Sequence, residues 1–280
     1  MNALEIKNLT KTFPNFKLDN LNLTLPSGCI MGLIGENGAG KSTTIKLILN
    51  MLSKDSGTIT ILGKNNEENF QVTKEDIGVV MDEVGIPDCF NAKQVGKIMK
   101  HTFQNWNSNE YARLLTKLSL PNDTPFKNFS RGMKMKLSIA IALSHNSKLL
   151  LLDEATSGLD PVIRDEVVEM LHEFTRNEQH SILISSHIVS DLEKLCDYIA
   201  FLHKGKLLLC EEKDLLLGKY GILHCTVEQL QTLNPKAIAY KKESTYGIEA
   251  IVLRDFISTD CTIQPINIED LFLFMIKSNK

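Results

Sequence analysis

The sequence predicts an α/β fold that contains a mostly parallel sheet, an antiparallel β subdomain, a helical insert and a small C-terminal α+β appendage. Residues 149–155 contain four consecutive leucines and residues 181–188 contain the run Ile-Leu-Ile, as expected of strands buried on both faces of a sheet. Helical segments follow both, and strands that alternate with helices form a parallel sheet covered on both faces. The helical insert is predicted at about 88–147 and the appendage at 211–280.

The first 35 residues predict three strands, because apolar and polar residues alternate along most of them. The segments are ALEIKNLTKTF (3–13), LDNLNLTL (18–25) and CIMGLIG (29–35). The sequence Pro-Ser-Gly at 26–28 separates the last two strands and is typical of a turn. After a glycine-rich loop, STTIKLILNML (42–52) has apolar residues at helical spacing, and SKDSGTITILGK (53–64) predicts a turn and a strand.

From residue 77 the chain predicts one short strand and then the helical insert. The strand is IGVVMDE (77–83), and helices are expected in KQVGKIMKHTF (93–103), SNEYARLLTKLSL (108–120) and MKMKLSIAIALS (133–144). Beyond the first buried strand, Pro161 opens a helix over 161–177, which is a position that proline favours. The second buried strand leads to a helix at 189–196 and a hairpin-like pair of strands at 198–209.

The appendage, residues 211–280, carries no motif with an evident chemistry. Short strands and one helix are expected in YGILHCTVEQL (220–230), AIAYKKES (237–244) and GIEAIVL (247–253), and NIEDLFLFMIKSN (267–279) closes the chain as an amphipathic helix. A dimer contact, a regulatory module and extra packing surface are all compatible with this pattern.

Composition excludes several classes of protein. A chain of 280 residues is long enough for one α/β domain and a small appendage. With 43% hydrophobic and 23% charged residues it is not mostly disordered. The formal net charge of -3 argues against nucleic acid as the main partner. The six cysteines are scattered, which favours reduced thiols over a zinc site or a disulfide framework.

The N-terminal residues MNALEIKNLTKTF lack the apolar core of a signal peptide. The longest apolar runs, such as 149–152, are far too short to cross a bilayer. We therefore expect a cytoplasmic protein. If it acts at a membrane, another chain supplies the spanning segments.

The stretch GENGAGKST fits the phosphate-loop pattern G-x-x-x-x-G-K-[ST], and it follows a predicted strand and opens a predicted helix, as that motif requires. Glycines let backbone N–H groups wrap a phosphate, and the helix N-terminus adds partial positive charge. Lys41 is expected to reach the β- and γ-phosphates, while Ser42 gives an oxygen to Mg²⁺. The expected ATP-binding residues are Gly35, Asn37, Gly38, Ala39, Gly40, Lys41, Ser42 and Thr43.

The segment LLLLDE places two acids at the end of a buried strand. Asp153 would reach the mouth of the sheet and hold Mg²⁺ through water, and Glu154 would polarise an attacking water. Acids at strand ends are common, so this segment alone equally fits a solvated turn. Together with the phosphate loop it predicts a nucleotide-hydrolysing site on a P-loop NTPase core.

These motifs, together with SGLD (157–160) and His187, resemble the ATP-binding subunit of an ABC transporter in both content and order. The resemblance covers roughly residues 1–210, which we expect to be an ABC-type ATP-binding domain. It implies that Phe13 stacks on adenine, that Glu154 is the general base and that His187 contacts the γ-phosphate. It also implies that SGLD lines an interface with a second such subunit.

Two positions depart from the family pattern. Asp82 stands where the family usually has glutamine, and a carboxylate there is still able to ligate Mg²⁺. The stretch 129–133, Phe-Ser-Arg-Gly-Met, stands where the family has Leu-Ser-Gly-Gly-Gln. We expect Ser130 and Gly132 to meet the γ-phosphate of the opposing subunit, with Ser130 as a helix cap. The side chain of Arg131 would point to solvent or add positive charge near the nucleotide.

The resemblance implies an ATPase that uses ATP and Mg²⁺ to power a membrane transporter with separate integral-membrane permease subunits. Three features resemble those of the ATPase subunits of exporters for antibiotics, peptides and other amphipathic compounds: the acidic Asp82, the Ser-x-Gly-Met stretch and the appendage. The chain would then lie on the inner face of the cell membrane. An importer ATPase, an ABC-type ATPase without a transport role and a non-hydrolysing ATP switch are the alternatives.

Overall fold

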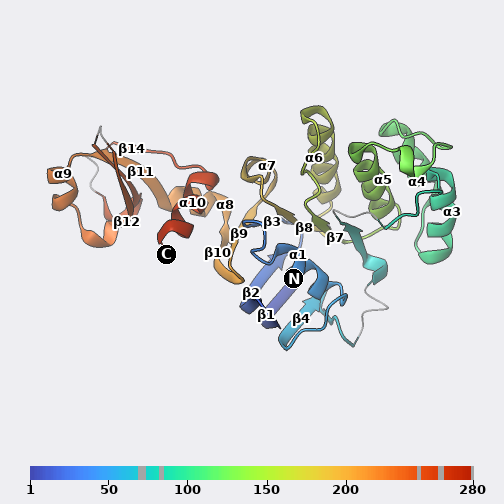
Figure 1. The fold of residues 1–280 in the computed structure, drawn as a ribbon, viewed down its shortest axis with the longest axis horizontal. Coiled ribbons are helices and arrows are strands. Elements are labelled where there is room, and N and C mark those ends of the chain that lie inside the picture. Colours follow the sequence, from blue (N-terminus) through green and yellow to red (C-terminus); the bar gives the residue numbers. More distant parts are fainter. Residues whose placement is uncertain (69–73, 82–84, 245–246, 258–261, 279–280) are drawn as a thin grey trace. The chain divides into compact units, whose positions relative to one another are not determined.

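The computed structural model describes the chain except residues 69–73, 82–84, 245–246, 258–261 and 279–280. Its contacts divide it into two compact units, Met1–Leu209 and Cys210–Lys280 (Figure 1). The first unit contains the phosphate loop, the two strand-end acids and the helical insert. The second unit corresponds to the region where the sequence changes character.

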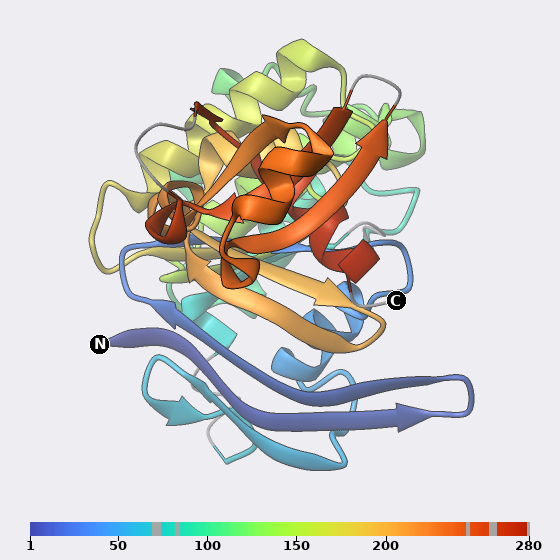
Figure 2. The ribbon, with the colours of Figure 1, turned by 90° about the vertical axis from the view of Figure 1, so that its left-hand side faces the viewer.

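The antiparallel subdomain is a four-stranded sheet in the order β2-β1-β4-β5. Its strands are β1 (Asn2–Phe13), β2 (Phe16–Pro26), β4 (Ser56–Ile61) and β5 (Lys64–Asn65). Strands β1 and β2 form a long antiparallel hairpin, and β4 pairs with the other edge of β1 (Figure 2). The alternating residues Leu21, Leu23 and Leu25 of β2 are buried, so period-two patterning places one face of the sheet in the core.

The central sheet has six strands in the order β10-β9-β3-β8-β7-β6. Its strands are β3 (Ile30–Ile34), β6 (Ile77–Val80), β7 (Leu149–Asp153), β8 (Ser181–Ser186), β9 (Tyr198–His203) and β10 (Lys206–Glu212). Strands β6, β7, β8, β3 and β9 pair in parallel. Every residue of β3, β7 and β8 is buried, which explains why apolar residues follow one another in these strands without alternating with polar ones.

Parallel pairing brings the carboxyl ends of β3, β7 and β8 to one edge of the central sheet. The helices that follow these strands are α1 (Lys41–Ile48), α6 (Pro161–Thr175) and α7 (Val189–Leu195). Asp160 caps α6 by accepting hydrogen bonds from the N–H groups of Val162 and Ile163, and Pro161 occupies the first turn. Ligands bind open parallel sheets at this edge.

The insert contains α3 (Ala92–Thr102), α4 (Ser108–Lys117) and α5 (Arg131–Leu143). Asn91 and Gln94 form a capping box at the start of α3. The Tyr111 hydroxyl on α4 donates to Ala92 O on α3 at 2.9 Å, and burial raises the pKa of Tyr111. The sequence correctly predicted all three helices, which end within three residues of the expected positions.

The second unit holds a four-stranded antiparallel sheet in the order β12-β13-β11-β14. Its strands are β11 (Tyr220–Cys225), β12 (Ile238–Ser244), β13 (Gly247–Leu253) and β14 (Ile263–Gln264). Its helices are α8 (Lys213–Lys219), α9 (Val227–Thr232) and α10 (Ile268–Ser278). The sequence did not predict α8, because KDLLLGK is a single two-turn segment that contains a glycine.

No helix in the described ranges combines the length and the apolar character needed to span a bilayer.

Burial of His145 predicts an acid-sensitive helical insert. The His145 ring stacks on Phe103 with centroids 4.0 Å apart, and its Nδ1 donates to Glu75 O at 3.0 Å. Desolvation lowers the pKa of His145 below its ordinary value of 6.5. Between that lowered pKa and pH 6.5, the unfolded chain binds a proton that the folded protein excludes. Stability therefore falls as the pH drops through this window, by at most about 1.4 kcal/mol per pH unit.

Urea denaturation across this window tests the effect. The variant His145→Gln removes the titrating group, so its unfolding free energy should fall less steeply with acidification than that of the wild type. Equal slopes for the two proteins would contradict a neutral buried His145.

Candidate functional site

The phosphate loop connects β3 to α1 and has the backbone conformation that its glycines allow. Gly38 has φ +80°, and Gly40, the residue before the first turn of α1, has φ +113°. A Cβ on Gly35 would lie 2.5 Å from Leu202 O, so this position has no room for a side chain. Gly40 offers no side chain to cap α1, and the first N–H groups of the helix remain suited to an anion.

A cavity of about 640 Å³ lies over this loop. Its lining residues are Asn15, Phe16, Asn37, Gly38, Gly40, Lys41, Ser42, Thr43, Glu154, Ser157 and His187. Four separate chain segments, the β1–β2 hairpin, the phosphate loop, the residues after β7 and the end of β8, therefore contribute to one cavity. Most of the sequence-predicted residues of this site are among them.

Lys41 is held in the centre of the site. Its side chain is only 5% exposed, and its Nζ donates to Gly35 O at 2.7 Å. The same Nζ lies 3.2 Å from Glu154 Oε1. A buried ammonium group requires partners of this kind, and an anionic phosphate at the loop would compete with Glu154 for it.

Glu154 is fixed from both ends. Its backbone is in the left-handed region, with φ +53°, and its N–H donates to Ser185 O at 3.1 Å and to Ser185 Oγ at 3.2 Å. Its carboxylate lies between two cationic or donor groups, because Oε2 is 2.7 Å from His187 Nδ1 and Oε1 faces Lys41. A carboxylate oriented in this way is suited to accept a proton from water bound beside the loop.

Asp153 is buried at the end of β7, with 3% of its surface exposed. Its Oδ1 accepts a hydrogen bond of 2.6 Å from Ser185 Oγ. Ser42 lines the cavity, whereas Asp153 does not and directly precedes Glu154, which does; a hydroxyl and, behind the cavity wall, a carboxylate are the hard oxygen donors at this place. Mg²⁺ takes one or two protein oxygens, with waters and phosphate oxygens as its other ligands, and this donor set fits it. Within the described ranges, no cluster of three or more acidic, histidine or cysteine side chains competes as a metal site.

The aromatic residue that lines the cavity is Phe16, whereas the sequence analysis named Phe13. Phe16, at the start of β2, lines the cavity, while Phe13 packs beside it with ring centroids 6.1 Å apart. Phe16, at the start of β2, and Asn15, in the turn before it, were not among the predicted residues. The length of the turn is the signal that would have identified them. A two-residue turn places Phe16 directly opposite Phe13, so a site near one residue is also near the other. The predicted contact of Phe13 with adenine stays a prediction.

Residues 129–133 form the start of α5. Ser130 is exposed and caps the helix by accepting a hydrogen bond of 3.2 Å from the Met133 N–H, as its sequence position predicts. Gly132 is buried, and a Cβ there would lie 2.7 Å from Ile163 Cδ1 on α6. The absence of a side chain at 132 therefore has a packing role within the chain.

Arg131 lies against Gly158 of the SGLD stretch. Its Nη1 is 2.6 Å from the point that a Cβ on Gly158 would occupy, and Gly158 has φ +68°. Neither expectation for this side chain described such a contact. Arg131 is exposed, as one of the two expectations has it, and its guanidinium group also lies against the SGLD loop. Asp82, the other departure, lies outside the described residues, and its metal role stays a prediction.

The comparison with known proteins decides the family. Residues 18–157 match the ABC transporter family. The lantibiotic transport ATP-binding protein SrtF of Streptococcus pyogenes is 39% identical over 214 residues, which are 75% of this chain and 91% of that protein. The chain belongs to the ABC transporter family.

Other similar proteins agree with this assignment. The bacitracin transport ATP-binding protein BcrA of Bacillus licheniformis is 36% identical over 73% of this chain and 68% of its own length. A solved ATP-binding subunit of an ABC transporter superposes with a TM-score of 0.67 at 27% identity, over 76% of this chain and 90% of that chain. This ABC protein thus has the predicted P-loop fold, and it binds and hydrolyses ATP to power membrane transport.

Ser185 forms hydrogen bonds with two consecutive acids, Asp153 and Glu154, so we expect its removal to lower the stability of the protein. The variant Ser185→Ala deletes the donor to Asp153 and leaves that buried carboxylate without a charge-assisted hydrogen bond. We expect the unfolding free energy to fall by about 1–3 kcal/mol.

Ser181, a buried serine on the same strand, is the matched control. Its Oγ accepts a hydrogen bond of 3.0 Å from the neutral N–H of Gly28, so Ser181→Ala should cost about 0.5–1.5 kcal/mol. Chemical denaturation compares the two variants. A Ser185→Ala protein at least as stable as Ser181→Ala would contradict the special role of Ser185.

Proposed function

We propose that this chain is the ATPase of an exporter for peptides, antibiotics or other amphipathic compounds. Similarity to proteins named for lantibiotic transport and bacitracin transport supports this class of cargo. The observation that carries the ATPase mechanism is the contact of Glu154 with both Lys41 and His187 at the phosphate loop. The proposal concerns the cargo, the direction of transport and the residues that act.

The loop residues bind the phosphates of ATP in this proposal. Backbone N–H groups around Gly38 and Gly40 and the open start of α1 face the phosphate oxygens. Lys41 exchanges its contact with Glu154 for the β- and γ-phosphates. Ser42 and Asp153 hold Mg²⁺, which supplies charge neutralisation on the phosphates. Phe16 and Phe13 offer aromatic surface for the base.

Glu154 acts as the general base. Transfer of Lys41 to the phosphates leaves the Oε1 side of Glu154 open toward the cavity, where it accepts a proton from the attacking water. His187 holds Oε2 through its Nδ1, so the carboxylate keeps its orientation while its other oxygen reacts. The remaining ring nitrogen of His187, Nε2, is available to the γ-phosphate.

A second ATP-binding subunit completes the site in this proposal. Its Ser130, Gly132 and SGLD stretch approach the γ-phosphate from across the interface, and two ATP molecules are enclosed. Closure of this dimer moves separate integral-membrane permease subunits, and the chain lies on the inner face of the cell membrane. Residues 211–280 serve as an accessory domain. Co-purification with the permease, followed by ATPase and transport assays with lantibiotic peptides, tests the cargo class.

Glu154→Gln tests the general base. The amide keeps the size of the side chain but cannot take a proton from water, so we expect turnover to fall at least 100-fold. Affinity for ATP should stay within a few-fold of wild type, and the variant should accumulate as an ATP-bound dimer. Steady-state ATPase activity, a fluorescent nucleotide titration and size-exclusion chromatography measure these three quantities. Wild-type turnover would remove Glu154 from the mechanism.

Gly132→Asp tests the approach of α5 to the partner's phosphate. A carboxylate at this helix start repels the γ-phosphate, so dimerisation in the Glu154→Gln background and ATP hydrolysis should both be lost, while ATP binding by the single subunit persists. Gly132→Ala is the matched control, because its Cβ meets the same Ile163 side chain without adding charge. If both variants lose activity equally, packing against α6 and not phosphate contact explains the glycine.

A further inference from the structure

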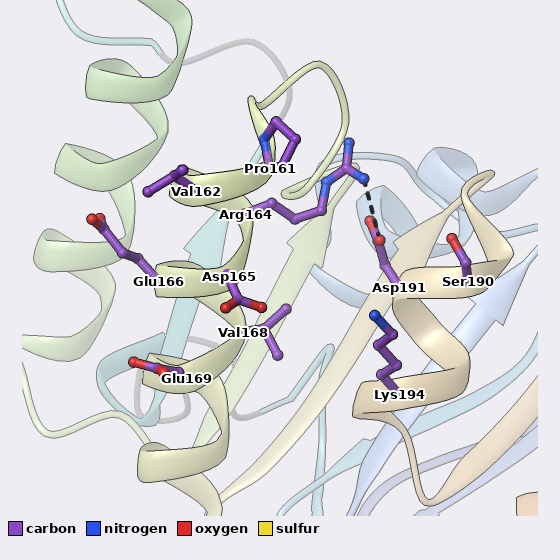
Figure 3. A pocket seen from close by; sticks show the side chains of 10 residues that line it. All are labelled: Pro161, Val162, Arg164, Asp165, Glu166, Val168, Glu169, Ser190, Asp191 and Lys194. Atoms are coloured by element: carbon purple, nitrogen blue, oxygen red, sulfur yellow. Dashed lines mark hydrogen bonds and ion pairs between the residues drawn. The ribbon is translucent and has the colours of Figure 1, made fainter.

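A groove of about 570 Å³ separates α6 from α7, and the side chain of Arg164 reaches across it (Figure 3). Arg164 lies in the first turn of α6, four residues after the SGLD stretch ends. Asp191 lies in the first turn of α7, four residues after His187. The two residues thus connect the start of α6, which follows β7, with the start of α7, which follows β8.

The guanidinium group of Arg164 has one contact on each side of this groove. Its Nη1 lies 3.5 Å from Asp191 Oδ1, as the dashed line in Figure 3 marks. Its Nη2 donates to Leu159 O, in the SGLD stretch, at 3.3 Å. One side chain therefore contacts both the SGLD loop and α7, a geometry that the planar fork of arginine permits and lysine does not.

The pair is poorly suited to a purely stabilising role. Asp191 is only 8% exposed, and both contacts of Arg164 are long for hydrogen bonds. Among the described residues, Asp191 Oδ2 and Arg164 Nε are buried and have no hydrogen-bond partner. Replacing a buried ion pair of this quality with apolar side chains is often neutral for stability or increases it. Its position between two site loops is the feature that stability does not explain.

These contacts close a ring around the site. Glu154 Oε2 contacts His187, and Asp191 lies one turn beyond His187. Arg164 connects Asp191 to Leu159, which lies five residues after Glu154. A displacement of α7 relative to the SGLD loop would therefore change the separation of His187 from Glu154.

We propose that Arg164 and Asp191 are positioning residues that set the distance between the SGLD loop and His187 and so keep Glu154 oriented for water attack. This inference rests on the proposed function of Glu154 and His187. The pair acts on the hydrolysis step and not on the affinity for ATP, because neither residue lines the cavity over the phosphate loop.

The double variant Arg164→Met/Asp191→Leu separates positioning from stability. It replaces both charges with apolar side chains of similar size, so no buried charge is left without its partner. In the full chain we expect a midpoint of thermal unfolding close to that of the wild type and an ATP dissociation constant within about twofold. We expect kcat to fall about tenfold or more, which corresponds to a loss confined to the transition state.

Arg164→Lys provides the second measurement. Lysine keeps the charge opposite Asp191 but cannot hold Leu159 O at the same time, so kcat should fall several-fold with stability retained. Glu173→Gln is the matched control on α6, because it removes the exposed ion pair of Glu173 with Lys117 and should leave kcat unchanged.

Wild-type kcat in a folded double variant would overturn the inference. If the double variant does not fold, wild-type kcat in Arg164→Lys overturns it instead, and a several-fold loss supports it. A parallel measurement of Glu154→Gln distinguishes the two levels of the proposal. Full activity of Glu154→Gln would show that Glu154 is not the general base. If Glu154→Gln is inactive while the Arg164 and Asp191 variants keep the kcat of the wild type, only the positioning role is refuted.

Discussion

The carboxylate of Glu154, held between Lys41 and His187, is the interaction on which the site depends. The three residues come from segments far apart in the sequence: Lys41 from the phosphate loop after β3, Glu154 from the end of β7 and His187 from the end of β8. Only a parallel sheet with β7 and β3 on either side of β8 delivers all three segments to one edge. The central sheet is therefore the element that makes the local motifs into a single site.

Much of the fold was predictable because the local signals agree with the global arrangement. Apolar runs marked β7 and β8, a glycine-rich loop marked the start of α1, and Ser130 marked the start of α5 as a helix cap. The short helix α8 was missed because its sequence, KDLLLGK, contains a glycine, which is unfavourable inside a helix. The boundaries of the ATP-binding and accessory domains, as functional parts, remain predictions.

The phosphate loop and the acids at the end of β7 were predictable as candidate residues because each motif lies in one continuous segment. Contacts between distant segments were not. Ser185 carries no motif, yet it donates to Asp153 and accepts from Glu154. The packing of Gly132 on Ile163 joins residues 31 positions apart, and Arg131 lies against Gly158, which is 27 positions further along the chain. Such contacts depend on the relative placement of elements, which residue type and spacing do not encode.

The left-handed backbone conformation of Glu154 lowers the stability of the fold at a residue whose carboxylate is proposed to act in hydrolysis. A non-glycine residue with φ +53° stores about 1–3 kcal/mol of conformational strain, and the double hydrogen bond to Ser185 offsets part of it. Asparagine tolerates this conformation better than glutamate does. A chain selected only for thermal stability would therefore drift at this position toward a residue with no basic carboxylate. If Glu154 is the general base, as we propose, selection for turnover would retain the strained glutamate, and the rest of the core would have to offset the loss of stability.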